Sequence, residues 1–590
     1  MERNSDPMVF GKRMQLLVLL LLAGCLTPGL IHAQQTLIIR GGTLIDGNGG
    51  PPVPNATLMI IGERIREIRT TDGGPVPSGA QVLDARGKFI IPGMHEPHAH
   101  YKGWFLPLYI NYGVTSIYEI GNSATDWILA QREMMQKEKI VGPRLYACVL
   151  NLYGRARDGF LLPNMLIFET VAEAREAARR AVELGADCLK LQSGLTGEMM
   201  LAIAQVGREY DLPLIGHLPR GMNAFRAAEI GMNHLEHSGG IPEAISRDWS
   251  EVERLRAEFA RAMEGRPSNT FEATGIGFIN PDPAKEDELI KVLIEKDVYV
   301  EADWSGRMRN ITRRKTDWLT ENVTLVQRPE MAFIPKDARY RWLDYSAWNS
   351  FSPELKANLT RGLENWQKFM VKYSQAGGKV VVGGEAPTVM PGLNIHRNVH
   401  LLADAGIPPM KAIQAATKNV AELFRLDDDL GTLEVGKYAD LIILNADPLQ
   451  DITNTQDIAE VIQGGKIIDR RFSADWRNPI PTTEVTRDES GYNNPKPVIS
   501  MVEPPVAVEG EPNKTVRISG QGFTLGSVVY VGQKAVRTTF RSEELIEATL
   551  PKELLARVGT YAIQVANPEP LPPIEDFGLS NKFMFIVKFR

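Results

Sequence analysis

The sequence lacks the features that mark membrane-spanning and nucleic-acid-binding proteins. Past residue 33, no stretch is long and apolar enough to cross a membrane as a helix. The net charge of the 590 residues is only −6 and the basic residues form no stripe, so nothing points to a nucleic acid. No internal repeat is apparent. The composition, 43% hydrophobic and 23% charged, is that of a globular protein with several domains.

Cysteine is also scarce, with three in the whole chain. Cys148 and Cys188 stand inside apolar segments that are typical of strands. We expect two buried thiols there, although export would permit a disulfide. Cysteine therefore has no part in the predicted site.

The first 33 residues are typical of a secretory signal. Lys12 and Arg13 precede an apolar run at residues 14–23, which is too short to span a membrane. Two cleavage sites compete. Cleavage before Gln34 gives a freely secreted or periplasmic protein. The segment ending at Cys25 resembles a bacterial lipobox, which would give an outer-membrane lipoprotein anchored through Cys25.

Four of the nine histidines follow predicted strands. His98 and His100 come after the run 89–93, His217 follows 214–216 and His237 follows 233–236. Residues two apart in an extended segment point the same way, so His98 and His100 can face one point. Imidazole suits Zn²⁺ and other first-row metals, whereas Mg²⁺ and Ca²⁺ prefer oxygen. Together with Lys190, which ends another strand, these histidines predict a site for one or two divalent ions, with Zn²⁺ as the first choice.

The middle of the chain alternates strands and helices, which predicts a parallel sheet. Eight strands are expected, the number of a (β/α)₈ TIM barrel: 89–91, 114–117, 145–149, 188–191, 214–216, 233–236, 298–302 and 380–382. One connecting helix begins at a capping box formed by Thr170 and Glu173 and stops at Gly185. In such barrels the chemistry lies at the carboxyl ends of the strands, where the histidines and Lys190 fall.

Both flanks of the barrel are rich in short strands. We expect strands at 36–40, 43–45, 57–61, 64–68 and 82–84, and again at 441–444 and 461–468. The mixed α/β architecture therefore consists of a barrel (91–424) and one small β-sandwich built from both flanks (34–90 and 425–472). A linker broken by prolines (473–496) and an immunoglobulin-like β-sandwich (497–590) follow.

The barrel carries an excess segment at about residues 305–350, rich in Trp, Tyr and Arg. Three interpretations stay open for it. It could be a lid over the barrel mouth, an oligomer contact, or a surface decoration without a role in catalysis.

Residues 36–475 resemble the amidohydrolase superfamily, in particular its imidazolonepropionase-like and dipeptidase-like members. The resemblance rests on five segments: IPGMHEPHAH at 91–100, GADCLK at 185–190, GH at 216–217, GMNHLEH at 231–237 and GTLEVGKYADLI at 431–442. Residues 497–588 resemble an IPT/TIG domain through VRISGQGF at 516–523 and GSVVYVG at 526–532.

The resemblance implies specific roles for Lys190 and for an acid after the eighth strand. Lys190 would be carbamylated and would bridge two metal ions, which an unmodified ammonium would repel. The acid would bind metal and accept a proton. The family has Gly-Thr-Asp there, whereas this chain has Gly383-Gly384-Glu385, and we expect Glu385 to serve as metal ligand and catalytic residue. Glu96 and Glu119 also stand where related chains often have Asp.

Several other residues have alternative interpretations. Lys190 could form an ion pair with Glu96 or Glu119 inside the barrel mouth. His234 is expected in the core, and His396 could support the site. Three arginines that follow strands could meet a substrate carboxylate or lie at the surface: Arg155, Arg157 and Arg220.

The sequence thus predicts an exported, metal-dependent hydrolase that cleaves C–N bonds in small amides, cyclic amides or peptides. Two alternatives stay open. Glu385 is compatible with a catalytically impaired barrel that acts as a secreted binding or surface protein. A deaminase is the other, although that group typically uses one metal and no bridging lysine.

Overall fold

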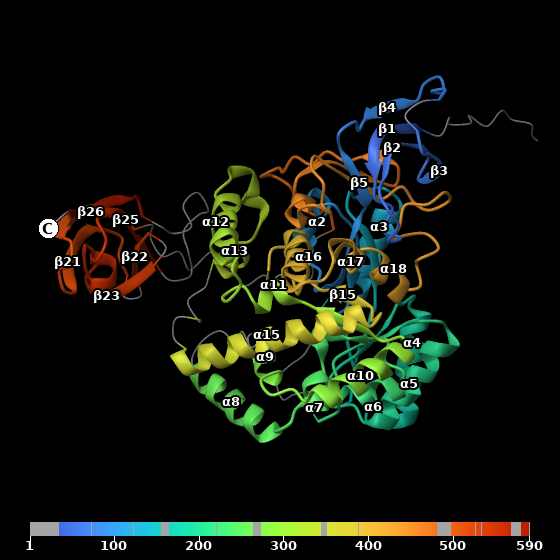
Figure 1. Cartoon of the computed structure of the whole chain (residues 1–590), viewed down its shortest axis with the longest axis horizontal. Coiled ribbons are helices and arrows are strands. Elements are labelled where there is room, and N and C mark those ends of the chain that lie inside the picture. The colour runs from blue at the N-terminus through green and yellow to red at the C-terminus, as the bar shows by residue number, and fades with distance from the viewer. Residues whose placement is uncertain are drawn as a thin grey trace, which may run out of the picture.

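The structure is a computed structural model that describes residues 35–71, 74–121, 123–154, 164–219, 221–263, 273–343, 348, 351–386, 389–480, 497–524, 527–532, 534–567 and 580–588. The predicted signal with both cleavage sites lies outside these residues, as do Arg155, Arg157 and Arg220. Figure 1 shows a barrel between an N-terminal sheet and a separate C-terminal sheet domain. Within the described ranges, no helix has the length and apolar character needed to cross a membrane.

The central part is a closed barrel of parallel strands, which confirms the predicted (β/α)₈ fold. The strands are β6 (Met94–Ala99), β7 (Val114–Glu119), β8 (Arg144–Ala147) with its continuation β9 (Asn151–Tyr153), β11 (Leu189–Leu191), β12 (Leu214–Gly216), β13 (His234–Leu235), β14 (Tyr299–Ala302) and β15 (Val380–Val382). Neighbours pair in chain order within three sheets, β6–β7–β8, β9–β11–β12 and β13–β14–β15. Between β12 and β13, the Asn233 N–H donates to Leu214 O at 2.9 Å. The ring closes where Ala99 bridges Ala386. All eight carboxyl ends therefore meet at one mouth.

The first barrel strand comes one segment later than the sequence indicated. Residues 89–91 belong to β5 (Phe89–Pro92), which pairs with outer strands and not with β7. The barrel strand β6 begins after Gly93, where a Cβ would meet the Thr115 side chain at 2.2 Å. The prediction was wrong because β5 is apolar, whereas β6 contains the polar residues His95, Glu96 and His98, all of which are buried.

Helices surround the barrel (Figure 1). They are α2 (Leu106–Asn111), α3 (Thr125–Gln136), α4 (Val171–Glu183), α5 (Gly197–Glu209), α6 (Ala224–Ile230), α7 (Ile241–Ile245), α8 (Trp249–Ala262), α9 (Ala273–Gly277), α10 (Pro283–Glu295), α15 (Pro353–Gln375), α16 (Leu393–Ala405), α17 (Pro409–Gln414) and α18 (Lys418–Leu423). The predicted capping box starts α4, because Thr170 accepts from the Glu173 N–H and Glu173 accepts from the Thr170 N–H. Helix α4 then buries a row of alanines against the barrel.

Cys148 and Cys188 form a disulfide, so the prediction of two free thiols was wrong. Cys148 follows β8 and Cys188 precedes β11, two neighbouring parts of the ring, and their Cα atoms are 4.6 Å apart. Both are buried in the barrel interior with Ile215 and Val381. The sequence could not show the bond because the distance between the two side chains depends on how the strands line up.

The two flanks build one outer sheet. Its strands run in the order β18 (Lys466–Ile467), β17 (Ile458–Gln463), β16 (Leu441–Leu444), β5, β1 (Thr36–Leu44), β2 (Val53–Ile61) and β3 (Arg64–Arg69), with β4 (Gln81–Asp84) beside β1. The flanks meet where β5 pairs with β16. The chain then returns to the barrel, where Asn478 donates to Gly103 O at 3.2 Å and to Gln131 Oε1 at 2.9 Å.

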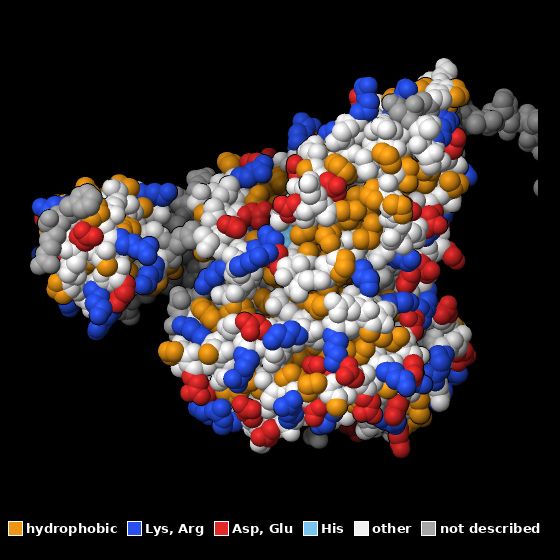
Figure 2. Space-filling view, viewed as in Figure 1, with side chains coloured by type: hydrophobic (Ala, Val, Ile, Leu, Met, Phe, Trp, Pro, Cys, Tyr) orange, Lys and Arg blue, Asp and Glu red, His pale blue; other side chains and the backbone are white. Residues whose placement is uncertain are grey.

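The C-terminal domain is an eight-stranded structure, as expected for an immunoglobulin-like sandwich. Its strands are β19 (Val498–Glu503), β20 (Val506–Val508), β21 (Lys514–Gln521), β22 (Val528–Val531), β23 (Lys534–Ser542), β24 (Leu545–Leu550), β25 (Gly559–Ala566) and β26 (Phe583–Lys588); the short helix α19 (Lys552–Leu555) precedes β25. They enclose a core of their own that includes Val516, Ile546 and Phe585. Figure 2 shows basic and acidic side chains intermixed on this face of both the domain and the barrel.

The excess segment of the barrel is helical. It comprises α11 (Trp304–Arg307), α12 (Lys315–Val326), η3 (Pro329–Phe333) and α13 (Lys336–Leu343). Val326 and Phe333 pack with Leu108 and Leu393 of the barrel helices. In Figure 1, α12 and α13 stand on the side of the barrel nearest the C-terminal domain. Only α11, the first turn, lies close to the predicted site.

Candidate metal centre

The predicted histidines lie together at the mouth of the barrel. His98 is in β6 and His100 follows it, while His217 and His237 follow β12 and β13. The ring centroids of His98 are 5.3 Å from His100 and 4.8 Å from His237, and those of His217 and His237 are 5.4 Å apart. Three strands that are distant in sequence, β6, β12 and β13, thus bring four imidazoles together.

Each of the four imidazoles is fixed from behind through Nδ1. The Nδ1 atoms donate to buried acceptors: His98 to Glu301 Oε1 (2.9 Å), His237 to Asp303 Oδ2 (2.8 Å), His217 to Gln192 Oε1 (2.9 Å) and His100 to Gly121 O (3.2 Å). An ionised carboxylate or a carbonyl oxygen can only accept, so Nδ1 carries the hydrogen and Nε2 is the nitrogen left for a metal ion. Such outer hydrogen bonds orient metal-ligating histidines in proteins.

Glu385 lies among the free nitrogens. Its Oε1 is 3.0 Å from His237 Nε2 and 3.6 Å from His98 Nε2, and its Oε2 is 3.8 Å from His100 Nε2. His98 Nε2 is buried and has no hydrogen-bond partner among the described residues. A buried orphan nitrogen, converging imidazoles and a carboxylate are what a divalent transition metal needs, so the residues present fit such an ion.

The protonation states of His98, His100 and Glu385 agree with metal binding, whereas His237 has to lose a proton to the incoming ion. Burial lowers the pKa of His98 and of His100 to about 4, so both are neutral at pH 7. Burial and Arg307 would lower the pKa of His237, but Asp303 and Glu385 outweigh them and raise it to about 10. Burial alone would raise the pKa of Glu385, but His237 and His98 outweigh it and hold that pKa well below its usual range. Neutral imidazole and ionised carboxylate are the forms that ligate metals.

Two site residues have left-handed backbone conformations. Glu385 has φ of +52° and His237 has φ of +56°, in a region that residues with a Cβ rarely adopt. Each such conformation costs roughly 1–3 kcal/mol and persists only where the surroundings enforce it. The chain therefore turns sharply at both positions to present these side chains to the centre.

Two glycines make room for the longer acids. A Cβ at Gly384 would meet Glu96 Oε2 at 1.7 Å, and a Cβ at Gly383 would meet Glu301 Oε1 at 1.7 Å. Glu96 fills this space and accepts from the N–H groups of His98 (3.1 Å) and Gly384 (2.8 Å). The resemblance has a threonine at the position of Gly384 and often an aspartate at the position of Glu96. The missing side chain of Gly384 leaves the space that the longer Glu96 occupies, as expected of a site built around glutamates.

Lys190 is completely buried and forms a very short ion pair with Glu236 Oε2. It does not pair with Glu96 or Glu119, the partners considered from the sequence. Glu119 instead accepts from the backbone N–H groups of Tyr101, Gly121 and Ser123. Lys190 therefore belongs to the centre, because Glu236 Oε2 is also 3.5 Å from His217 Nε2.

Sequence reasoning missed the residues that support the ligands. These are Gln192, Glu236, Glu301, Asp303 and Arg307. Arg307 in α11 donates to Asp303 Oδ2 at 2.5 Å and lies 3.8 Å from Glu385 Oε1. The sequence did contain a pattern that could have indicated two of them. Glu301 and Asp303 stand at the end of the seventh strand and are two residues apart, as His98 and His100 are.

The remaining histidines lie outside the ligand set. His234 is buried in the core beside Glu301, with Nε2 at 3.5 Å from Oε2, as expected. His396 donates to Tyr112 O at 2.7 Å and so does not support the centre.

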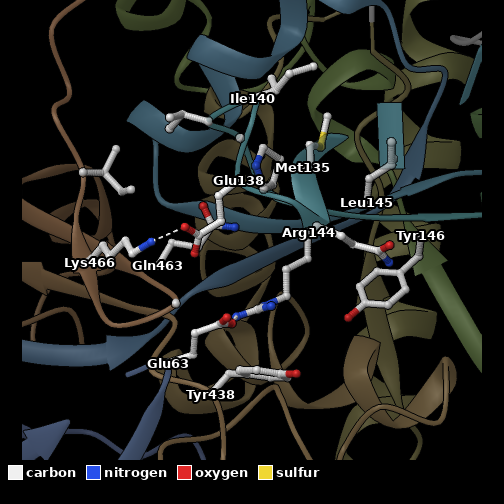
Figure 3. A pocket seen from close by; sticks show the side chains of 16 residues that line it. Glu63, Met135, Glu138, Ile140, Arg144, Leu145, Tyr146, Tyr438, Gln463 and Lys466 are labelled. Atoms are coloured by element: carbon white, nitrogen blue, oxygen red, sulfur yellow. Dashed lines mark hydrogen bonds and ion pairs between the residues drawn. The ribbon is translucent and has the colours of Figure 1, made fainter. Parts of the chain in front are cut away.

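An open pocket of about 450 Å³ lies at the other end of the barrel, where β8 begins. Figure 3 shows Arg144 at its middle, with Glu63 and Tyr438 on one side and the ion pair of Lys466 and Glu138 on the other. None of its lining residues belongs to the centre. This pocket therefore does not mark the predicted metal centre.

Residues 109–468 match the amidohydrolase family, and residues 497–581 match the IPT/TIG domain. An adenine deaminase of Rubrobacter xylanophilus is 24% identical over 439 residues, 73% of this chain and 58% of the deaminase. An N-acyl-D-aspartate deacylase of Alcaligenes xylosoxydans is 34% identical over 117 residues, 19% of this chain and 22% of the deacylase. The chain spans a little over half the length of the adenine deaminases that it matches along most of its own length.

Solved structures share the fold at low identity. A Xaa-Pro dipeptidase with bound methionine aligns with a TM-score of 0.50 and 20% identity, over 74% of this chain and 100% of that one. Ochratoxinase of A. niger aligns with a TM-score of 0.51 and 19% identity, over 76% and 100%.

Proposed function

Because the chain belongs to the amidohydrolase family, we propose that it is an exported, metal-dependent hydrolase that cleaves a C–N bond in a small amide, cyclic amide or peptide. The observation that carries this proposal is the set of four imidazoles, each fixed through Nδ1. The Nε2 atoms of His98, His100 and His237 lie 3.0–3.8 Å from Glu385, and His217 Nε2 lies 3.3 Å from His237 Nε2. Such buried, preorganised ligands have no purely structural use, since the orphan nitrogen of His98 is costly without a partner.

We assign one or two divalent ions, Zn²⁺ first, to six residues: His98, His100, Lys190, His217, His237 and Glu385. Bound metal lowers the pKa of water toward ~7 and polarises the bond to be cleaved. Lys190 can contribute only after its charge is removed, which the family resemblance explains by carbamylation. Its burial beside Glu236 fits this assignment, because no solvent competes for the modified side chain.

Glu385 is placed to move the proton. Its carboxylate is ionised, and it lies between His237 and Arg307 at the mouth. In the proposed reaction it takes a proton from the attacking water and passes it to the leaving nitrogen. His217 is the most exposed ligand, with 44% of its side chain accessible, so we infer that the substrate enters from its side.

Export is supported by the disulfide. Cys148 and Cys188 are bonded, and disulfides persist mainly in oxidising compartments. We propose a periplasmic or secreted protein whose mature end is Gln34, or a lipoprotein that begins at Cys25. Intact-mass measurement of exported protein distinguishes the two, and retention of Met1 would contradict both.

Two further functions have specific support. The adenine deaminase similarity favours a deaminase, which is also a C–N hydrolase. The Lys190–Glu236 ion pair and the glutamate at position 385 favour a catalytically impaired barrel with a binding role. The compensation between Gly384 and Glu96 argues for a functioning site.

The proposal is tested by metal analysis combined with an assay on amides, dipeptides and adenine. The His98→Ala/His100→Ala variant should lose most of its metal and all hydrolysis. His396→Gln is the matched control, because it changes a buried imidazole outside the centre and should keep both. Wild-type metal content in the double variant would show that the ligand assignment is wrong.

A further inference from the structure

Glu236 is absent from the ligand set above, yet its carboxylate faces the centre. It follows β13 and directly precedes His237 in the chain. Its Oε2 contacts Lys190 Nζ and lies 3.5 Å from His217 Nε2. Its Oε1 is buried and has no hydrogen-bond partner among the residues that the structure describes. One oxygen of this buried carboxylate is therefore left for a ligand.

Among the described residues, three groups of potential ligand atoms lie within 4.8 Å of one another, and all three contain His237. In the group with Glu301 and Asp303, the carboxylates bind Nδ1 of His98 and His237, so the groups His98–His237–Glu385 and His217–Glu236–His237 are left for ions. Because Nδ1 of His237 is bound to Asp303, its Nε2 can serve only one ion. With His217 and Glu236 it gives two imidazoles and one carboxylate, the three-ligand composition of many catalytic zinc sites, while His98, His100 and Glu385 remain for the other ion.

From this layout we propose that Glu236 is a direct oxygen ligand of a second ion, which it holds with His217 and His237. The inference rests on the proposed function. The Glu236 carboxylate is already part of the chain, whereas the carbamate on Lys190 forms only by modification. Metal binding by Glu236 and carbamylation of Lys190 are compatible. Once Lys190 gives up its charge, a buried Glu236 needs another cation, and the ion supplies it.

Glu236→Gln tests the proposal, since it keeps the size of the side chain and removes its charge. Wild-type protein should bind two Co²⁺ or Zn²⁺ equivalents. The variant should lose one of them or bind it at least ~10-fold more weakly, measured by metal analysis and chelator competition. His217→Ala should have the same effect. Glu119→Gln is the matched control, a buried glutamate without an imidazole contact, and should keep both ions.

The outcomes separate this inference from the proposed function. Unchanged stoichiometry and affinity in Glu236→Gln, with an unchanged Co²⁺ absorption spectrum, would overturn the role of Glu236 alone. Wild-type protein that binds no metal would instead overturn the proposed function.

A measurement on wild-type protein covers the case in which Glu236→Gln does not fold. In metal-loaded crystals, anomalous density should place an ion about 2.0–2.2 Å from a Glu236 oxygen. An ion on His217 and His237, with Glu236 bound only to Lys190, would reject the proposal.

Discussion

The two ends of the barrel hold their charged groups in opposite ways. At the carboxyl end, His98 Nε2 and Glu236 Oε1 are buried without a partner among the described residues. At the amino end, Arg144 pairs with Asp440 at 2.8 Å and with Glu63 at 3.1 Å, and lies over the ring of Tyr438 at 3.7 Å (Figure 3). The open pocket lies at the amino end, where Arg144 has these partners. Other buried atoms, such as the Thr115 and Ser116 hydroxyls, also have no partner among the described residues. The site is therefore located by unpartnered imidazole and carboxylate atoms that converge on one another, and not by the open pocket.

The largest expected effect is at the carboxyl end. Glu385→Gln should lower kcat by ~10²- to 10⁴-fold, because glutamine keeps the size of the side chain but cannot accept the proton. Steady-state kinetics on the best substrate measures this, with thermal unfolding as a check on the fold.

Glu385→Asp separates the enzyme from the impaired barrel. If the site is built around glutamates, aspartate withdraws the carboxylate from His98 and His237 and activity falls. Hydrolysis that is absent in wild type and present in Glu385→Asp would favour the impaired barrel. Unchanged activity in Glu385→Gln would remove Glu385 from catalysis.

The second-largest effect is expected from removing the disulfide, which lies inside the barrel between the two ends. Cys148→Ala/Cys188→Ala should lower the free energy of unfolding by about 4 kcal/mol, because the disulfide joins residues separated by 40 positions in the chain. Denaturant unfolding with and without reductant measures it. Reduced wild type should approach the variant, and an identical midpoint for oxidised wild type and variant would show that the bond is not formed in solution.

The third-largest effect is expected at the amino end, and it tests whether this end has only a structural role. Arg144→Leu should cost about 3 kcal/mol of stability, because Asp440 stays buried without its cation. The kcat/KM should stay within about twofold, since nothing connects this end to the centre. Lys466→Met is the control, an exposed ion pair with Glu138 whose loss should be barely measurable. A tenfold loss of kcat/KM in Arg144→Leu would break the contrast between the ends.

The sequence predicted the barrel because its strands follow from local pattern, and the histidines predicted as ligands lie together in the structure. Strands β12 and β15 were placed at their observed bounds, and His217 and His237 follow strand ends as expected, whereas His98 lies within β6. What it could not predict depends on contacts across the ring. The partner of Lys190, the disulfide and the space that Gly384 leaves for Glu96 all arise from segments that are distant in sequence.

Polarity explains the strand that was assigned wrongly. Strand β6 contains buried histidines and a buried glutamate, so its sequence lacks the apolar run that predicts a buried strand. The apolar β5 before it took its place in the prediction. The polar residues of β6 that belong to the site are thus the reason why the sequence did not predict it as a strand.

The smallest effect is expected for the C-terminal domain. A chain that ends at Asn494 should keep its metal and the unfolding midpoint of the barrel, because the core around Val516 and Phe585 shares no residue with the barrel core. Metal analysis and thermal unfolding measure both. A chain that ends at Asp469 is the matched control. It also loses Trp476, which packs on the barrel, and the hydrogen bonds of Asn478 to Gly103 and Gln131, so it should be less stable. Insolubility and metal loss in the Asn494 chain would mean that the C-terminal domain supports the barrel.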